Sequence, residues 1–261
     1  MTRWTVLDAA TMTQRAFWQW ARQPGPLAVT LLFPVLMVVI FSALLGGQMR
    51  VPDGADYDEL VIPGMLALAM AFGVEATMIA ITTDAAKGVT DRLRSMPMAP
   101  SAVVAGRAAA DMALSVAGLL VLVLAGLLVG WRWHEGVANL LAAVGLLLLL
   151  RLALVWVGVF LGLVAKTPEA VVAAQVLVWP IGFLSGVFVD PASMPAALGT
   201  VAEWNPLSAT ASAVRELCGN PGWGGSSWAA RHDVLLAVLW PLALIALFLP
   251  LSIRRYAALR R

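Results

Sequence analysis

Three ionisable residues, Glu75, Asp111 and Arg151, interrupt long runs of apolar residues in this sequence. A lone charge in the middle of a bilayer costs on the order of 3 kcal/mol, so such residues mark ion pairs, proton relays or polar cavities. Asp111 follows Arg107 by four residues, which places both on one helix face and predicts a local ion pair. We expect Glu75 and Arg151, at comparable depth, to pair or to face a common polar cavity. The alternative is that each has its own partner in another helix or in a second protomer.

Other chemistry finds little support in the sequence. The patterns of nucleotide-binding loops, serine hydrolases and zinc proteases are absent. Cys218 is the single cysteine, and His134 and His232 are far apart, so we expect neither a disulfide within the chain nor a metal site. The three intramembrane charges offer no nucleophile and base at helix spacing, which argues against an intramembrane enzyme. No basic face with interleaved aromatic residues suggests nucleic-acid binding. We therefore expect no catalytic residue and no cofactor on this chain.

The composition indicates the elements that must position these charges. Of the 261 residues, 61% are hydrophobic and 12% charged, with a mean hydropathy of +0.87, values typical of an integral membrane protein. Because one span needs about 20 apolar residues, we predict an all-α membrane protein with six transmembrane helices. Their predicted ranges are 27–47, 60–83, 102–130, 137–165, 171–189 and 234–253. Close helix packing, mostly within the chain, is predicted at three glycine pairs: Gly126/Gly130, Gly158/Gly162 and Gly182/Gly186.

The distribution of positive charge predicts the orientation. With both termini in the cytoplasm, most of the 17 Lys and Arg residues fall on the inner side, as multi-pass proteins of the bacterial cytoplasmic membrane require. The outer side then holds Arg50, Arg132, Arg215 and Arg231. Residues 1–26 suit a cytoplasmic helix lying in the membrane interface, with a frayed polar leader as the alternative. Residues 190–232 hold apolar pieces too short to cross, which we interpret as helices dipping into the outer leaflet.

A short charged segment, DRLRSMP, lies on the predicted cytoplasmic side between the second and third spans. Gly88 interrupts the preceding helix, Thr90 can cap a new turn, and Pro97 ends it. This pattern predicts a short amphipathic helix of the kind that docks into a groove on a soluble partner. A solvated loop that obeys the positive-inside rule is an equally good interpretation of these residues taken alone.

Five stretches in a fixed order resemble a known family: LVIPGM, KGVTDRLRSMPMAPSAVVAGR, AKTPEAVVAAQ, FLSGVFVDPASMP and EWNPLSATASAVREL. Together they resemble the ABC-2 family of transporter permeases, most of all its daunorubicin-resistance-type exporters, over nearly the whole chain. The resemblance implies the type V exporter fold. Residues 1–26 would then be the connecting helix, and residues 27–261 the transmembrane domain. Within that domain, residues 88–98 would hold the coupling helix and residues 190–232 an outer re-entrant helical hairpin.

The same resemblance implies partners and a function. A permease of this family works with two copies of a separate ATPase subunit, which binds ATP and Mg, and with a second permease chain in a homodimer or heterodimer. The residues implied to contact the ATPase are Thr90, Asp91, Arg92, Leu93, Arg94, Ser95, Met96 and Pro97. The implied function is export of a hydrophobic or amphiphilic drug, antibiotic or secondary metabolite, as in multidrug efflux. Export of a lipid or glycan-lipid precursor is the alternative.

Two features limit what the resemblance transfers. The approach Asp84 to Lys87 is less charged than in many such permeases, which leaves the detail of ATPase docking open. The family has no shared drug-binding motif, so no residue for the cargo is carried over. A channel or secondary transporter would instead predict inverted repeats and several converging midplane charges, and the sequence shows neither.

Overall fold

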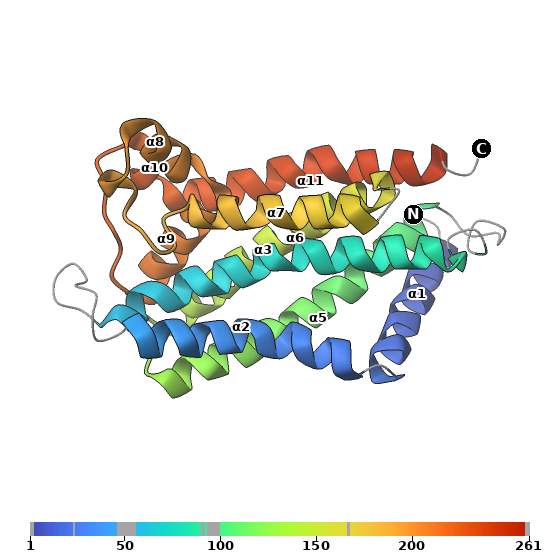
Figure 1. Cartoon of the computed structure of the whole chain (residues 1–261), viewed down its shortest axis with the longest axis horizontal. Helices are drawn as coiled ribbons and strands as arrows, with labels where there is room; N and C mark the ends of the chain where they lie inside the picture. The colour runs from blue at the N-terminus through green and yellow to red at the C-terminus, as the bar shows by residue number, and fades with distance from the viewer. Residues whose placement is uncertain are drawn as a thin grey trace.

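The protein is a bundle of helices, described by a computed structural model at residues 3–22, 24–45, 56–89, 92, 100–165 and 168–258. No strand occurs among those residues. The longer helices run side by side between two ends of one elongated bundle (Figure 1). They are α2 (Pro24–Leu45), α3 (Tyr57–Ala86), α5 (Pro100–Val129), α6 (Val137–Val164), α7 (Pro168–Phe183) and α11 (Asp233–Ala258).

Five of these helices, α2, α3, α5, α6 and α11, are long and apolar enough to cross a membrane. The chain is therefore a multi-pass membrane protein. The sixth predicted span corresponds to α7, which has 16 residues. That length gives a helix of about 24 Å, shorter than a hydrocarbon core of roughly 30 Å. The prediction of six spans therefore stays a prediction, and it requires the chain after α7 to complete the crossing.

The two ends of the bundle differ in what they hold. One end, here the terminal end, contains the start of α1 (Arg3–Arg22), the end of α3, the start of α5 and the end of α11 (Figure 1). The opposite end, here the hairpin end, contains the short helices α8 (Ala196–Trp204), α9 (Pro206–Cys218) and α10 (Trp228–Arg231). The start of α1 and the end of α11 lie at the same end of the bundle, as they must if both termini are on one side of the membrane.

The centre of the bundle is the contact between α3 and α6, where glycines let the backbones approach. A Cβ atom on Gly158 would stand 2.9 Å from the backbone oxygen of Val74 and 3.0 Å from Cβ of Thr77. A Cβ on Gly162 would stand 3.0 Å from Cβ of Ile81. The predicted packing of this glycine pair within the chain is confirmed.

Replacing Gly158 with alanine should therefore destabilise the protein by about 1–3 kcal/mol, because the new methyl group meets backbone that cannot rotate away. The matched control is Gly145→Ala on the same helix, where a Cβ atom meets nothing within 4 Å. That variant should be neutral or slightly more stable, since alanine favours the helix. Thermal unfolding in detergent measures both, and equal unfolding temperatures would contradict the packing.

Helix α7 ends six residues before the predicted span boundary at 189, so the last part of the predicted span is not part of this helix. Beyond Phe183 the side chain of Asn205 replaces the helix's own hydrogen bonds. Its Nδ2 donates to the carbonyl oxygens of Ile181 at 2.9 Å and Leu184 at 2.8 Å. The last turn of a helix leaves carbonyls without donors, and Asn205, between α8 and α9, supplies donors to two carbonyls here.

The region 190–232 begins with a short 3-10 helix (Pro191–Ser193) and continues through α8, α9 and α10. Asn205 caps α9 by accepting a hydrogen bond from the backbone of Leu207 at 2.9 Å, and Gly219 ends α9 in the left-handed conformation. Short helices were predicted here and are present. Their insertion into a membrane leaflet stays a prediction.

Helix α1 braces the terminal end of the bundle at a steep angle to the other helices (Figure 1). Thr13 Oγ1 donates to the carbonyl oxygen of Gly106 on α5 at 3.1 Å. Arg15 forms a salt bridge of 3.4 Å with Asp84 on α3. A helix is present where the N-terminal helix was predicted, and it contacts both helices that flank the predicted coupling segment. Its location in the membrane interface stays a prediction.

Candidate functional site

A buried polar network joins the middle of three helices. Arg151 on α6 donates from Nε to Oγ of Ser115 on α5 at 2.7 Å, and from Nη2 to Oγ1 of Thr77 on α3 at 3.3 Å. Thr77 Oγ1 in turn donates to Oδ2 of Asp111 on α5 at 2.7 Å. Arg107 completes the network with a salt bridge of 2.6 Å to Oδ1 of Asp111, which confirms the predicted ion pair.

Helix periodicity explains how the network forms. Arg107, Asp111 and Ser115 recur every four residues on α5 and therefore share one face. Gly73 lies one turn before Thr77 on α3 and leaves room for the guanidinium, since a Cβ there would stand 2.4 Å from Cζ of Arg151. These spacings align the polar groups of α5 along the side that faces Thr77 of α3 and Arg151 of α6.

The charges of the network are buried and compensate one another only in part. Asp111 and Arg151 are 4% and 3% exposed, respectively. One carboxylate serves two guanidinium groups, because Asp111 pairs with Arg107 and its charge also stabilises the protonated Arg151. Nη1 of Arg151 has no hydrogen-bond partner within the described part of the chain. The network therefore depends strongly on the single carboxylate of Asp111.

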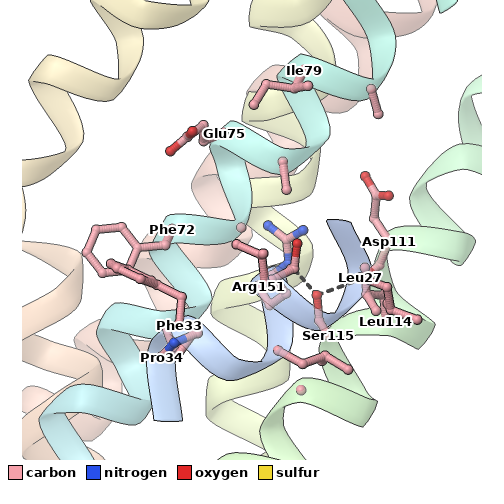
Figure 2. A pocket seen from close by; sticks show the side chains of 18 of the residues that line it. Leu27, Phe33, Pro34, Phe72, Glu75, Ile79, Asp111, Leu114, Ser115 and Arg151 are labelled. Carbon is pink, nitrogen blue, oxygen red and sulfur yellow. Dashed lines mark hydrogen bonds between the residues drawn. The ribbon is translucent and has the colours of Figure 1, made fainter. Parts of the chain in front are cut away.

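A cavity of about 890 Å³ lies above this network, between α2 and the helices α3 and α5. Its floor includes Arg107, Asp111, Ser115 and Arg151. Figure 2 shows the side chains of Arg151 and Ser115 hydrogen-bonded in this floor, with Asp111 close by. Its walls are mainly apolar and aromatic, and include Leu27, Phe33, Pro34, Phe72, Ile79, Leu114 and Trp179.

Glu75 and Arg151, which were expected to pair or to share a cavity, both line this cavity. No salt bridge joins their side chains among the residues that the structure describes. Figure 2 shows why: Glu75 points to the same side of α3 as Phe72, whereas Arg151 lies against the other side, toward Ser115. Both residues thus share one cavity, whose walls are mainly apolar, and a direct pair between them is not found among the described residues.

Of the residues predicted to contact the ATPase, the structure describes one, Arg92. The backbone N–H of Arg92 donates to the carbonyl oxygen of Gly88 at 3.2 Å, which continues a helical turn past the end of α3. The other predicted contact residues lie outside the described residues: Thr90, Asp91, Leu93, Arg94, Ser95, Met96 and Pro97.

A second buried arginine, Arg215 on α9, was missed as a structural residue because the sequence placed it in an outer loop. It is 1% exposed, and its guanidinium donates to the carbonyl oxygens of Leu60, Gly186 and Val187 at 2.8, 2.9 and 2.9 Å. Burial lowers the pKa of Arg215 to about 10, so the group stays protonated near neutral pH. The side chain ties the hairpin end to the start of α3 and to the chain that follows α7.

The signals for these partners were weak in the sequence. Thr77 and Ser115 are small hydroxyl residues that apolar helices tolerate without functional meaning. The partners of Arg215 are backbone carbonyls, which every residue carries. Glycine offers one clue, since Gly64 on α3 makes room for Arg215 as Gly73 does for Arg151: a Cβ on Gly64 would lie 3.1 Å from Nη2 of Arg215.

The arrangement favours binding over catalysis. Within the described ranges, no group of three or more His, Cys, Asp and Glu side chains is close enough to hold a metal ion. The hydroxyl groups of Ser115 and Thr77 hydrogen-bond to a backbone carbonyl and to a carboxylate, respectively, and are not set against an imidazole. A large apolar cavity with a few converging polar groups is the usual form of a small-molecule site.

Comparison with known proteins finds a matching protein family and a similar protein. The family described as "ABC-2 type transporter" matches residues 8–218, which is most of the chain. The chain is also 32% identical over 252 residues to the daunorubicin resistance ABC transporter permease protein DrrB1 of Streptomyces coeruleorubidus. That alignment covers 95% of this chain and 86% of the relative.

Proposed function

The chain belongs to the ABC-2 family of transporter permeases, and from this premise we propose that it is the membrane-spanning subunit of an ATP-binding cassette exporter. It moves a hydrophobic or amphiphilic compound, such as a drug, antibiotic or secondary metabolite, out of the cell. The observation that carries the proposal is the cavity between α2, α3 and α5, whose volume of about 890 Å³ suits a drug-sized molecule. The similar protein of Streptomyces coeruleorubidus is named as a daunorubicin resistance permease, which supports a drug as the cargo.

The energy comes from ATP hydrolysed with Mg by a separate subunit, present in two copies beneath a dimer of permease chains. Segment 88–98 is the coupling helix and docks on that subunit. Two hydrogen-bonded contacts support a mechanical link, since Thr13 and Arg15 of α1 hold the start of α5 and the end of α3 together. These two helices form walls of the cavity, so movement of the segment between them changes the cavity's shape. Transport needs such a difference between two states.

In the membrane, the chain makes six crossings with both termini in the cytoplasm. Helix α7 and the capped chain after it form the fifth crossing. Two observations support this topology: the first and last described residues share one end of the bundle, and the basic residues concentrate there (Figure 1). The hairpin end, with α8, α9 and α10, then faces outward.

Docking is tested with an ATP-binding cassette ATPase subunit from the same genome, co-expressed and co-purified with the permease. Because the side chain of Arg92 is exposed on the segment proposed to dock, Arg92→Ala should reduce the co-purified ATPase about tenfold, the effect of losing a central contact. Arg94→Ala and Asp91→Ala should act in the same direction. Arg132→Ala, an exposed arginine outside the α3–α5 link, is the matched control and should bind normally. Normal binding and ATP turnover in all three segment variants would remove the docking assignment.

Cargo is tested in inside-out vesicles that contain the complete transporter. ATP-dependent uptake of daunorubicin, with little movement of a fluorescent phospholipid, is the expected result. Uptake of the phospholipid without the drug would instead favour an exporter of a lipid or glycan-lipid precursor.

A further inference from the structure

Three aromatic rings form a column at the hairpin end, where Figure 1 shows α8 and α10 beside the start of α11. The indole of Trp204, the last residue of α8, stacks on that of Trp228, the first residue of α10, with ring centroids 5.8 Å apart. Trp228 stacks in turn on the imidazole of His232, directly before α11, at 4.5 Å. The rings are nearly parallel, since neighbouring planes meet at 17° and 16°. The column therefore joins α8, α10 and α11.

The two tryptophans of the column combine a large apolar ring with an available polar group. Trp204 and Trp228 are 45% and 51% exposed, respectively. Among the described residues, no protein group accepts a hydrogen bond from either indole N–H. His232 braces the column, because its Nδ1 donates to the carbonyl oxygen of Trp228 at 2.8 Å. Side chains with an apolar body and an available donor suit the level at which a bilayer meets water.

An apolar strip on α8 continues the column. Leu198 and Val201 precede Trp204 by six and three residues, so they lie along the same side of the helix, and they are 44% and 54% exposed. The other side of α8 is packed on protein, where Gly199 and Ala202 are buried. Helix α8 therefore has one side fixed to the hairpin end and one apolar side that no described part of the chain covers.

Helix α11 places the column relative to the bilayer. Leu235, Leu239 and Leu242 are 45%, 49% and 48% exposed and recur at spacings of four and three, which marks the lipid-facing side of this span. From Leu235 to the exposed Arg254, the helix rises about 28 Å, close to a hydrocarbon core of roughly 30 Å. With Arg254 at one headgroup level, Leu235 begins the hydrocarbon at the other. His232, three residues earlier, then lies among the headgroups.

We propose that the column of Trp204, Trp228 and His232, with the apolar strip of α8, is a binding site for phospholipid headgroups. The leaflet is the one at the hairpin end, which is the outer leaflet in the proposed topology. The indole N–H groups donate to ester and phosphate oxygens, while the rings, Leu198 and Val201 cover the upper part of the acyl chains. Helix α8 then lies flat at headgroup depth, continuous with the lipid-facing side of α11.

The site also fixes the level of the end of α7. Asn205 follows Trp204 directly, and its side chain donates to the carbonyl oxygens of Ile181 and Leu184 at 2.9 and 2.8 Å. Headgroups that hold Trp204 therefore hold the point at which α7 ends. This inference goes beyond the proposed export function, and its test needs neither the ATPase nor a cargo.

Fluorescence quenching tests the depth of α8. A nitrobenzoxadiazole label is attached to Val201→Cys in the purified permease, in phosphatidylcholine nanodiscs; Cys218 is 1% exposed and stays unlabelled. The quenchers are a nitroxide on the lipid headgroup, a nitroxide in the middle of the acyl chain, and iodide in the water. The headgroup nitroxide should quench at least about twofold more than either of the others. Strongest quenching by the acyl-chain nitroxide would show a helix that dips into the leaflet, and strongest quenching by iodide a helix in water. Either result overturns the proposal.

Variants of the column test its part in this binding. Trp228→Leu removes the ring and its N–H, so quenching of the label by the headgroup nitroxide should fall about twofold while quenching by iodide rises. Trp228→Phe keeps a stacked ring and loses only the N–H, so it should unfold at the wild-type temperature in detergent and still lower the headgroup quenching. Unchanged quenching in both variants overturns the proposal.

Two reference variants separate headgroup binding from general effects. Trp18→Leu removes a tryptophan that is 61% exposed on α1, away from the hairpin end, and should leave the quenching of the label at Val201→Cys unchanged. A label at Leu242→Cys, on the lipid-facing side of α11, should be quenched most by the acyl-chain nitroxide. If that label and the one at Val201→Cys showed the same order of quenching, α8 would not lie at headgroup depth and the proposal would fail.

Discussion

Asp111→Asn is expected to destabilise the protein by about 3–5 kcal/mol, the usual cost of leaving buried charges without their partner. The carboxylate forms the salt bridge with Arg107 and accepts the hydrogen bond of Thr77, and its charge compensates Arg151. Asparagine keeps the shape but removes the charge, so the buried guanidinium of Arg151 and the partly buried one of Arg107 lose their counter-charge. The temperature at which half of the detergent-purified protein stays monodisperse measures the loss.

Asp84→Asn is the matched control for this experiment. It removes the same charge near the same cavity, but its salt bridge with Arg15 is partly exposed and worth about 0–1 kcal/mol. A double variant, Asp111→Asn with Arg151→Leu, should recover part of the stability, because one uncompensated cation is gone. If Asp111→Asn were as stable as Asp84→Asn, the carboxylate of Asp111 would not be needed to compensate the guanidinium groups of the network.

Arg215→Leu is expected to cost about 3 kcal/mol or more, since hydrogen bonds from a charged donor contribute about 1.5–3 kcal/mol each. The carbonyl of Gly186 keeps Trp223 as a second donor, at 2.8 Å, and that of Leu60 keeps its helical partner. The carbonyl of Val187 suffers most. We expect the hairpin end to loosen first, so proteolysis between α7 and α9 should accelerate along with the fall in unfolding temperature.

Arg231→Leu provides the comparison at the same end of the bundle. Its guanidinium also donates to a backbone carbonyl, that of Ser226, but the side chain is exposed and water can replace it. The change in stability should stay within about 0.5 kcal/mol. If Arg215→Leu behaved like Arg231→Leu, the buried guanidinium would not hold the hairpin end in place.

Features formed by residues close together in the sequence were predictable from local patterns. The ion pair of Arg107 and Asp111 was predictable because four residues separate them on one helix. Gly158 and Gly162 were recognisable as a close-packing pair for the same reason. The early end of α7 was not predictable, because hydropathy does not show that Asn205, more than twenty residues away, donates to the carbonyls of Ile181 and Leu184.

The candidate site itself was predictable only in part. Glu75 and Arg151 were singled out as charges in apolar helices, and both line the cavity. That they lie on different sides of α3, with Arg151 held by Ser115 and Thr77, depends on how the helices rotate against one another. No pattern within one helix encodes that rotation, which is set by packing across the interfaces.

By itself, the sequence determined the class of this protein: long apolar runs must bury their backbone polar groups in helices, so an all-helical membrane protein follows from composition alone. The order of its motifs indicated the family. Only the tertiary structure decided which polar groups meet, because partners such as Arg151 and Thr77 are separated by 74 residues along the chain. It also decided that Arg215, expected at the surface, is buried against carbonyl oxygens that any sequence would supply.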